Sequence, residues 1–528
     1  MKTRLTQWVV RLAVGLLAAA PACAGVFGPQ RTAVFLLDYL NDGNEQPAEA
    51  FRSAFFEADN SYAAFIREAS LGQADLVGDV FGWYHLPADH LASGYWPSEQ
   101  EVFQVARNDV NDFRAYEKYV FVVRRSLVDE GGVSTFGPIL FHTPDGDVQA
   151  TRCTLWTFLY PVPTVDGTLN SSITHELIHS FGVRGHANAF DAGASFSTTD
   201  LNVSQQYGYG DPFDIMGGRW WAAHPNAAFK RNIGWLSEDQ EIVSENSGVH
   251  VLYPQEIPGP GAKLITIPLA QAIPVTNGVA MSRYYVEYRT PVGFDETLSA
   301  LQNGRFGAPR PVNTEGLLVR GGMMSEGHLT STWLLDATPE SLPAEYGRTG
   351  DFIDAFLLPG RFVYDPYNGI RITCGERRAD GGIEVGVKHL PDLEILGAVI
   401  TPIPGRWYSR ARLTIRNRYP WNHPALAPGQ RYIYVAYEGL VWDAGTGEYR
   451  RPRVKPDWNT VTAIMGSALT DLMTRGEATV NLYVSNPVND SFDALVFMVD
   501  PQFNDFYGVT GRVEEGDDAN NRFIVSVQ

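Results

Sequence analysis

The chain has 528 residues, which is enough for three or four domains of about 150 residues each. Its formal net charge of −19 argues against a nucleic-acid partner, because such a partner requires a basic protein surface. With 33 prolines, 51 glycines and 12% aromatic residues, the composition favours a chain rich in strands and loops.

Residues 1–24 have the pattern of a secretory signal peptide. Basic residues precede the apolar run 12–20, and Ala22 and Ala24 flank Cys23 as the small residues of a cleavage site. We therefore expect cleavage after Ala24 and a secreted, extracellular protein, with a periplasmic or cell-surface location as the alternatives. A buried first helix and lipid attachment at Cys23 are the competing interpretations of this segment. No later apolar run is long enough to span a membrane.

Residues 25–240 have the pattern of an α/β domain with a mixed sheet. Apolar and β-branched runs predict strands at 31–40, 74–86, 119–123 and 138–142. Apolar residues at helical spacing predict a helix at 47–70. A further helix is predicted at 224–236, where Asn226 can cap the first turn and apolar residues share one face.

The segment SSITHELIHSFGVRGHANAF, residues 171–190, carries the strongest chemical pattern in the chain. In a helix, His175 and His179 lie at i and i+4 on one face, so both imidazoles can reach one zinc ion at about 2.0–2.1 Å. Glu176 lies about 100° around the helix, where a carboxylate can reach a zinc-bound water and serve as its general base. A solvated helix face with a stray glutamate is the competing interpretation, although a chance match to this motif is rare.

The residues around this helix predict its two ends and a third metal ligand. Asn170 and the two serines that follow it can cap the start of the helix. Gly182 can adopt the left-handed conformation that ends a helix and reverses the chain. The reversed chain then offers His186, and three histidines with one water form a catalytic zinc arrangement that keeps an open position.

The pattern H-E-x-x-H-x-x-G with a further histidine resembles that of the metzincin zinc peptidases. That clan also has a methionine turn beneath the metal, and YGDPFDIMGG, residues 209–218, is similar to it, with Met216 as the methionine. The residues D-I-M-G-G and the later I-G-W-L resemble the gametolysin-like and immune-inhibitor-A-like families, and similarities extend over residues 30–390. The resemblance implies a metzincin-like fold, a Zn²⁺ cofactor, peptidase activity and a packing role for Met216 below the metal.

Two positions depart from the metzincin pattern. The usual spacing places the third ligand at position 185, which is glycine here, so His186 is one residue further on. Asn188 and Asp191 are the alternative third ligands. Some clan members also have a tyrosine two residues after the methionine, and Gly218 occupies that position here. The possible substitutes for that tyrosine are His224, Tyr207 and Tyr209, and a structural role is the commoner interpretation of each.

The rest of the chain predicts β-structure. Residues 241–390 contain short alternating runs separated by turn residues, which predict a β-rich domain packed on the catalytic one. Residues 391–528 contain about seven more such runs, which suit an immunoglobulin-like β-sandwich. A polar turn before the last strand is a weak candidate for Ca²⁺ binding and is more commonly a simple turn; its residues are Asp517, Asp518, Asn520 and Asn521. Cys153 and Cys374 can form a disulfide or remain two buried thiols.

The residues and the resemblance together predict a secreted zinc endopeptidase, with His175, His179 and His186 as zinc ligands and Glu176 as general base. The expected partner is a protein or peptide substrate, such as an extracellular-matrix or cell-surface glycoprotein, and we expect a monomer. One alternative is a secreted binding or adhesion protein with an inactive peptidase-like domain, against which the intact Glu176 argues. Another is a narrow-specificity zinc hydrolase of glycoprotein or cell-wall peptide.

Overall fold

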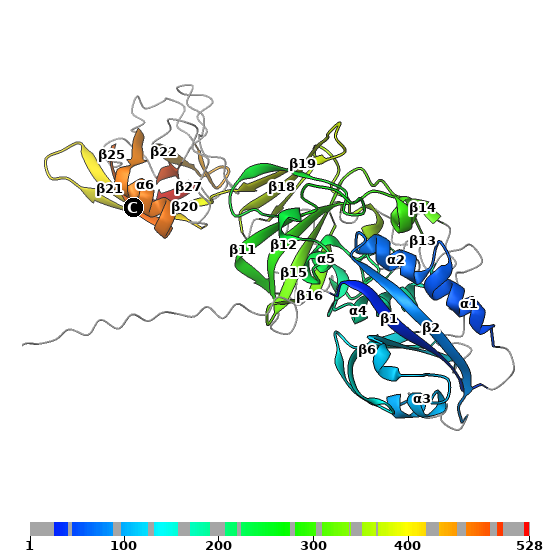
Figure 1. Ribbon diagram of the computed structural model, residues 1–528. Helices are drawn as coiled ribbons and strands as arrows, with labels where there is room; N and C mark the ends of the chain where they lie inside the picture. Colours follow the sequence, from blue (N-terminus) through cyan, green and yellow to red (C-terminus); the bar gives the residue numbers. More distant parts are fainter. Residues whose placement is uncertain are drawn as a thin grey trace, which may run out of the picture.

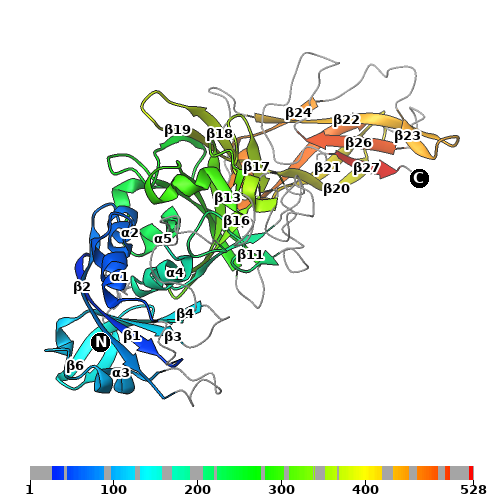
Figure 2. The same cartoon turned by 90° about the vertical axis from the view of Figure 1, so that its right-hand side faces the viewer.

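The computed structural model shows three successive parts along an elongated molecule (Figure 1). Figure 2 shows the same order in a second view, from the blue and cyan α/β part to the orange and red C-terminal strands. The described residues are 26–40, 45–87, 97–124, 131–156, 169–190, 206–218, 223–274, 280–302, 309–336, 338, 351–365, 368–418, 432–450, 461–485, 494–499 and 522–526. The predicted signal peptide, Asp191 and the predicted calcium site at Asp517, Asp518, Asn520 and Asn521 lie outside these residues.

The first part is an α/β unit built on a mixed sheet of strand order β2-β1-β3-β6-β4, with β5 paired to β6. Its strands are β1 (Gly28–Asp38), β2 (Ala74–His85), β3 (Lys118–Arg124), β4 (Gly131–Ser134), β5 (Ile139–Thr143) and β6 (Gly146–Trp156). β2, β1, β3 and β6 pair in parallel with one another, whereas β4 and β5 run antiparallel to β6. The predicted α/β arrangement with a mixed sheet is therefore confirmed.

The single helix predicted over 47–70 is wrong, because the chain forms two helices there. α1 (Ala48–Arg52) continues into a π-helical turn (Ser53–Glu57), and α2 (Tyr62–Ala69) starts after a break. The break ends at Ser61, whose side chain accepts a hydrogen bond from Ala64 N at 3.1 Å and so caps α2. Short polar side chains favour helix caps over helix interiors. The apolar spacing runs across this cap, and for that reason it predicted one helix that was too long.

Two hydrophobic cores cover the two faces of the mixed sheet. Alternate residues of a strand point to opposite faces, so Val34 of β1 lies in the first core and Phe35 in the second. Helices of the first core are α1, α2, α4 (Ser171–Ser180) and α5 (Ala227–Asn232), and α3 (Glu99–Val105) contributes to the second. The predicted cap of α5 is confirmed, since Asn226 accepts a hydrogen bond from Phe229 N at 3.0 Å.

In the described residues, the second part has two larger sheets that share one core, a two-stranded sheet and a further small core. The larger sheet has the order β8-β7-β16-β15-β12-β11-β9, the smaller has the order β10-β19-β18-β17, and β13 pairs with β14. The strands are β7 (His186–Phe190), β8 (Gln206–Tyr207), β9 (Glu241–Val243), β10 (Gly248–Leu252), β11 (Leu264–Pro274), β12 (Ala280–Tyr288), β13 (Ala300–Gln302), β14 (Pro309–Pro311), β15 (Leu317–Ser325), β16 (His328–Leu335), β17 (Phe362–Asp365), β18 (Ile370–Arg377) and β19 (Ile383–His389). The seven-stranded sheet takes β7 and β8 from before residue 240 and its other strands from after it. The domain boundary at 240 stays a prediction, but this sheet spans it.

The third part has two antiparallel sheets that share one core. One has the order β20-β21-β25 and the other β23-β22-β26-β27, with β24 paired to β22. The elements are β20 (Leu393–Pro402), β21 (Tyr408–Asn417), β22 (Tyr432–Asp443), β23 (Glu448–Arg450), β24 (Val461–Met465), α6 (Gly466–Arg475), β25 (Glu477–Ser485), β26 (Ala494–Val499) and β27 (Arg522–Ser526). The predicted β-structure of the C-terminal region is thus confirmed at the level of its sheets.

The two cysteines of the described chain are free and buried. Cys153 lies in the first core of the α/β unit and Cys374 lies in the core of the second part. Of the two possibilities that the sequence left open, the structure therefore has the pair of buried thiols. Within the described ranges, no helix has the length and apolar character needed to cross a membrane.

Candidate metal centre

Helix α4 carries the first two histidines of the predicted site. It begins after Asn170, whose side chain accepts a hydrogen bond from Ile173 N at 3.1 Å, so the predicted cap is confirmed. The helix ends at Ser180, and Gly182 has a φ of 110°, in the left-handed region that lets the chain reverse. The apolar residues of the helix lie in the first core of the α/β unit, which fixes the orientation of the helix.

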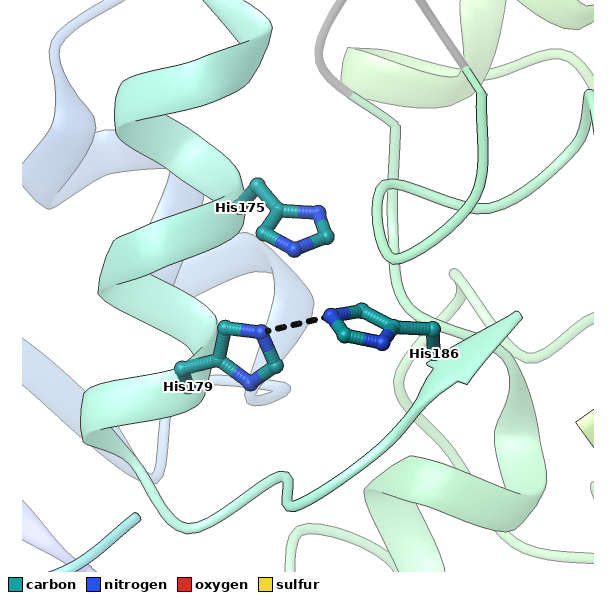
Figure 3. Close-up of side chains that lie close together, drawn as sticks. All are labelled: His175, His179 and His186. Carbon is teal, nitrogen blue, oxygen red and sulfur yellow. Dashed lines mark hydrogen bonds between the residues drawn. The ribbon is translucent and has the colours of Figure 1, made fainter. Parts of the chain in front are cut away.

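The chain that leaves α4 returns as strand β7, whose first residue is His186. Figure 3 shows the rings of His175 and His179, on the helix, facing the ring of His186, on the strand. The Nε2 atoms of His179 and His186 are 3.2 Å apart, and the three rings offer nitrogens that all lie within 4.8 Å of one another. The 3.2 Å separation of the first pair is close to that of two nitrogens that each bind one zinc ion at about 2.0–2.1 Å. The structure therefore brings the three predicted histidines together.

Backbone carbonyls set the ring orientation of the two helix histidines. His175 Nδ1 lies 2.8 Å from Ile215 O, and His179 Nδ1 lies 2.7 Å from Val183 O. A carbonyl oxygen can only accept a hydrogen bond, so each Nδ1 carries a proton and donates it. Each Nε2 then keeps its lone pair, which is the form of the ring that binds a metal, and the carbonyls hold each ring in place.

Burial keeps the three imidazoles neutral. It lowers the pKa of His175 to about 4, and burial together with the neighbouring His175 lowers the pKa of His179 to about 3. Burial also lowers the pKa of His186. The cause is that an imidazolium loses favourable hydration when it is enclosed by protein. At neutral pH each ring is therefore neutral, with one nitrogen protonated and the other carrying the lone pair that a metal would bind.

Glu176 places a buried carboxylate beside the histidines. The residue is 7% exposed, and its Oε2 has no hydrogen-bond partner among the described residues. Strand β4 covers it so closely that a Cβ on Gly132 would lie 2.2 Å from Glu176 Cγ. Burial raises the pKa of Glu176 to about 7, although a hydrogen bond with Ser134 acts in the opposite direction. A carboxyl group of this kind can both accept and return a proton near neutral pH.

The turn at residues 211–217 contacts both α4 and β7. Its Ile215 carbonyl orients His175, and its Met216 carbonyl accepts a hydrogen bond from Ala187 N at 2.9 Å. The Met216 side chain is fully buried in the first core, together with Leu177 of α4. The Met216 side chain is therefore a packing residue of the first core, and the backbone of its turn contacts His175 and β7.

The glycine at position 185, which shifts the third histidine of the predicted pattern by one residue, has a steric cause. A Cβ on Gly185 would lie 1.7 Å from Thr330 O, because the chain passes against strand β16 at this point. β7 pairs with β16 in parallel register, with His186 opposite Ser331. No side chain fits at position 185, and position 186 is the first from which a ring faces α4.

Replacing Gly185 by alanine should therefore separate β7 from β16 and displace His186. We expect a loss of at least about 3 kcal/mol in the free energy of unfolding, at the upper end of the range for overpacking, because the clash is with backbone. The zinc content of the purified protein should fall as well. Denaturant unfolding and metal analysis check both effects. Gly208→Ala is the matched control, since its nearest neighbour would be Asn188 Oδ1 at 4.0 Å; equal stability of the two variants would refute this explanation of the offset.

Asn188, one of the alternative third ligands, is engaged elsewhere. Its Oδ1 accepts a hydrogen bond from Tyr209 N at 2.9 Å, and its Nδ2 donates to Ser331 Oγ at 2.5 Å. Both ends of the amide are therefore engaged, the oxygen with the backbone of Tyr209 and the nitrogen with Ser331 of β16. The other alternative, Asp191, lies outside the described residues.

Tyr209 is the substitute tyrosine that contacts the histidines. Its ring centroid lies 4.3 Å from that of His186, and its Oη is 3.1 Å from His186 Nε2. Its φ of 58° lies in the left-handed region, which bulky residues rarely adopt unless the surroundings impose it. Tyr207 packs instead against Phe352, and His224 is fully buried elsewhere.

A second group of metal-ligating side chains lies at one edge of the mixed sheet. Asp38, Glu45 and His85 come within the distances that a metal ion would require. Arg124 Nη1 already donates a hydrogen bond to Asp38 Oδ1 at 3.2 Å, so a protein cation supplies positive charge there. We therefore interpret this group as an ion-pair cluster.

No protein-family model and no curated protein matches this sequence.

Proposed function

We propose that this chain is a secreted zinc-dependent endopeptidase. The observation that carries the proposal is the convergence of His175, His179 and His186 beside the buried, unpartnered carboxylate of Glu176. The resemblance of H-E-x-x-H-x-x-G and of the turn at Met216 to the metzincin pattern supports the same reaction class. Without the glutamate, the histidines would equally suit a structural metal site.

The donor set fits zinc. Three imidazole nitrogens are typical of a catalytic zinc site with an open position, whereas calcium and magnesium prefer oxygen ligands. His179 and His186 face each other with Nε2 atoms 3.2 Å apart, and a cation between them would satisfy both lone pairs. The neutral state of the buried rings favours the same occupant.

A zinc ion held there supplies Lewis-acid chemistry, which polarises the scissile carbonyl and lowers the pKa of a water molecule to about 7. Glu176 accepts the proton of the attacking water through Oε2, the oxygen without another partner. Its burial shields the proton from solvent until Glu176 delivers it to the leaving amine nitrogen. The C–N bond then breaks, and the two peptide products carry a carboxylate and an amine.

Strand β4 offers a binding edge for an extended substrate. In the described part of the sheet, β4 is the terminal strand and pairs on one side with β6. The other side leaves backbone donors and acceptors to which a peptide can add as a further strand. Because β4 also covers Glu176, such a peptide would pass the histidines in mid-chain. This geometry favours an endopeptidase, since it needs no free substrate terminus.

Tyr209 is placed to donate a hydrogen bond to the developing oxyanion, because its Oη lies 3.1 Å from a ring nitrogen of His186. Tyr209→Phe should lower kcat by about 10²–10³-fold, which is the usual effect of removing one such donor. KM and zinc content should change little, because the three histidines are the proposed ligands and the phenol is assigned to the oxyanion. Steady-state kinetics and atomic absorption test this, with Tyr207→Phe as the control. An unchanged kcat would remove Tyr209 from the mechanism.

The test of the proposed function is metal analysis and hydrolysis of casein or gelatin by the purified mature chain. We expect one zinc ion per chain and hydrolysis that stops on chelation and returns with zinc. Zinc binding without hydrolysis of any peptide would favour the alternative of a binding protein with an inactive peptidase-like domain.

The finer fold is part of the same proposal. We assign residues 25–240 to a metzincin-like unit on the basis of the mixed sheet with its antiparallel edge strand β4, the helix α4 and the turn at Met216. We assign residues 391–528 to an immunoglobulin-like sandwich, because two antiparallel sheets share one core there. Helix α6 is an addition to such a sandwich.

A further inference from the structure

Several ionisable side chains are buried where the turn at residues 211–217 meets the seven-stranded sheet. Among them are Asp211, Asp214, Glu287, Arg289 and Arg320, each at most 2% exposed. Removing charges from water is costly, and a buried ion pair often contributes less to stability than well-packed apolar residues would. Such a network suits a role in fixing one particular geometry.

Arg320 joins the turn to the sheet. From strand β15, its Nε donates to Asp211 Oδ2 at 2.6 Å, and its Nη1 donates to Glu287 Oε1 at 2.5 Å. Glu287 lies on the neighbouring strand β12 and also accepts a hydrogen bond from Ala227 N, at the start of α5, at 2.6 Å. One planar guanidinium thus fixes the turn, two strands and a helix start relative to one another.

The aspartates carry this constraint into the turn. Asp211 Oδ1 accepts a hydrogen bond from Phe213 N at 2.9 Å, and Asp214 Oδ1 accepts one from Met216 N at 2.7 Å. The second arginine, Arg289, donates to the carbonyl of Phe213. Because these bonds are buried and involve charged groups, the turn cannot shift without losing several strong interactions.

Two carbonyls of the turn at residues 211–217 contact His175 and the residue that follows His186. Ile215 O accepts the hydrogen bond from His175 Nδ1 at 2.8 Å. Met216 O accepts a hydrogen bond at 2.9 Å from Ala187 N, the residue after His186. A shift of the turn would therefore rotate the His175 ring and pull on the strand that carries His186.

We propose that Arg320 is a positioning residue for the metal centre, so that the seven-stranded sheet is a working part of the catalytic unit. The inference rests on the proposed function, since it concerns the histidines assigned to zinc. Arg320 acts through Asp211 and the turn, and it touches neither metal nor substrate. The sheet also contains β7, so His186 and Arg320 belong to one hydrogen-bonded layer.

The experiment uses the full chain and three variants. Arg320→Lys keeps the positive charge but loses the fork that reaches two carboxylates, and Asp211→Asn keeps the shape of the side chain but loses its charge. Tyr284→Phe is the matched control, because it removes a buried hydrogen bond to Asp365, 2.9 Å long, in the same part of the molecule without touching the turn. The measurements are zinc dissociation into a competing chelator, the melting temperature, and amide hydrogen exchange of residues 206–218 in metal-free protein.

Zinc should dissociate on the order of tenfold faster from Arg320→Lys and Asp211→Asn, since outer partners of metal-binding histidines are typically worth 10–100-fold in affinity. Amides of the turn should exchange faster in both variants. Tyr284→Phe should lower the melting temperature without changing either rate. Wild-type rates in both variants, or rates that follow the melting temperature in all three proteins, would overturn the proposal and leave Arg320 a purely structural residue.

The readouts separate this inference from the proposed function. A wild-type chain that binds zinc but hydrolyses no peptide refutes the peptidase and leaves the zinc-dissociation test of Arg320 in force. A wild-type chain that binds no zinc also refutes the peptidase, and hydrogen exchange of the metal-free turn then decides alone whether Arg320 positions it.

Discussion

Replacing Glu176 by glutamine should lower the rate of peptide hydrolysis by about 10²–10⁴-fold, the usual contribution of a general base. Glutamine has the same shape as glutamate but cannot take up the proton of the attacking water. Zinc content should stay at the wild-type level, because the three histidines form the candidate ligand group without Glu176. The fold should also persist, since a neutral amide costs less to bury than a carboxylate.

The measurement is kcat/KM on a fluorogenic peptide beside zinc analysis of the same preparation. Glu57→Gln is the control, because that glutamate is exposed in the α/β unit and far in sequence from the histidines. Loss of zinc from the Glu176 variant would show that Glu176 is a ligand, and the division of roles among the four residues would have to be redrawn. Full activity with zinc retained would exclude Glu176 as the base.

Local chemistry allowed the sequence to predict the centre of the site. The i and i+4 spacing of His175 and His179 defines one helix face, and the structure forms α4 over both residues. The predicted caps at Asn170 and Asn226 form because each side chain accepts a hydrogen bond from the backbone amide three residues on. These features depend on neighbours within one or two helical turns, so the local sequence is sufficient to predict them.

Features that depend on distant chain could not be predicted in this way. The pairing of β7 with β16 joins His186 to Ser331, 145 residues later in the sequence, and it alone explains the glycine at position 185. Arg320 is 109 residues from Asp211 and carries no local signal of that contact. The strained backbone of Tyr209 also follows from its surroundings, since nothing in its own residue type favours a positive φ.

Removing the imidazole of His186 should abolish hydrolysis and weaken zinc binding on the order of 100-fold or more, because even the outer partners of metal-binding histidines are worth 10–100-fold in affinity. In His186→Ala the two helix histidines remain, but they alone do not complete a catalytic zinc set. The fold should survive, since the backbone hydrogen bonds of β7 do not depend on the side chain of its first residue. Zinc content after dialysis against a weak chelator measures the effect, and circular dichroism checks the fold.

Asp191→Ala is the matched comparison, because Asp191 is the competing third ligand from the sequence. It should keep both zinc and activity if His186 binds the metal. The contacts of the described residues favour His186, because its Nε2 lies 3.2 Å from His179 Nε2 and its ring contacts that of Tyr209. The other alternative, Asn188, already uses its amide oxygen and nitrogen in hydrogen bonds with Tyr209 and Ser331. If the His186 variant retains its full zinc while the Asp191 variant loses it, the third ligand must be reassigned to Asp191, and the position of β7 beside α4 must then serve substrate binding instead of metal binding.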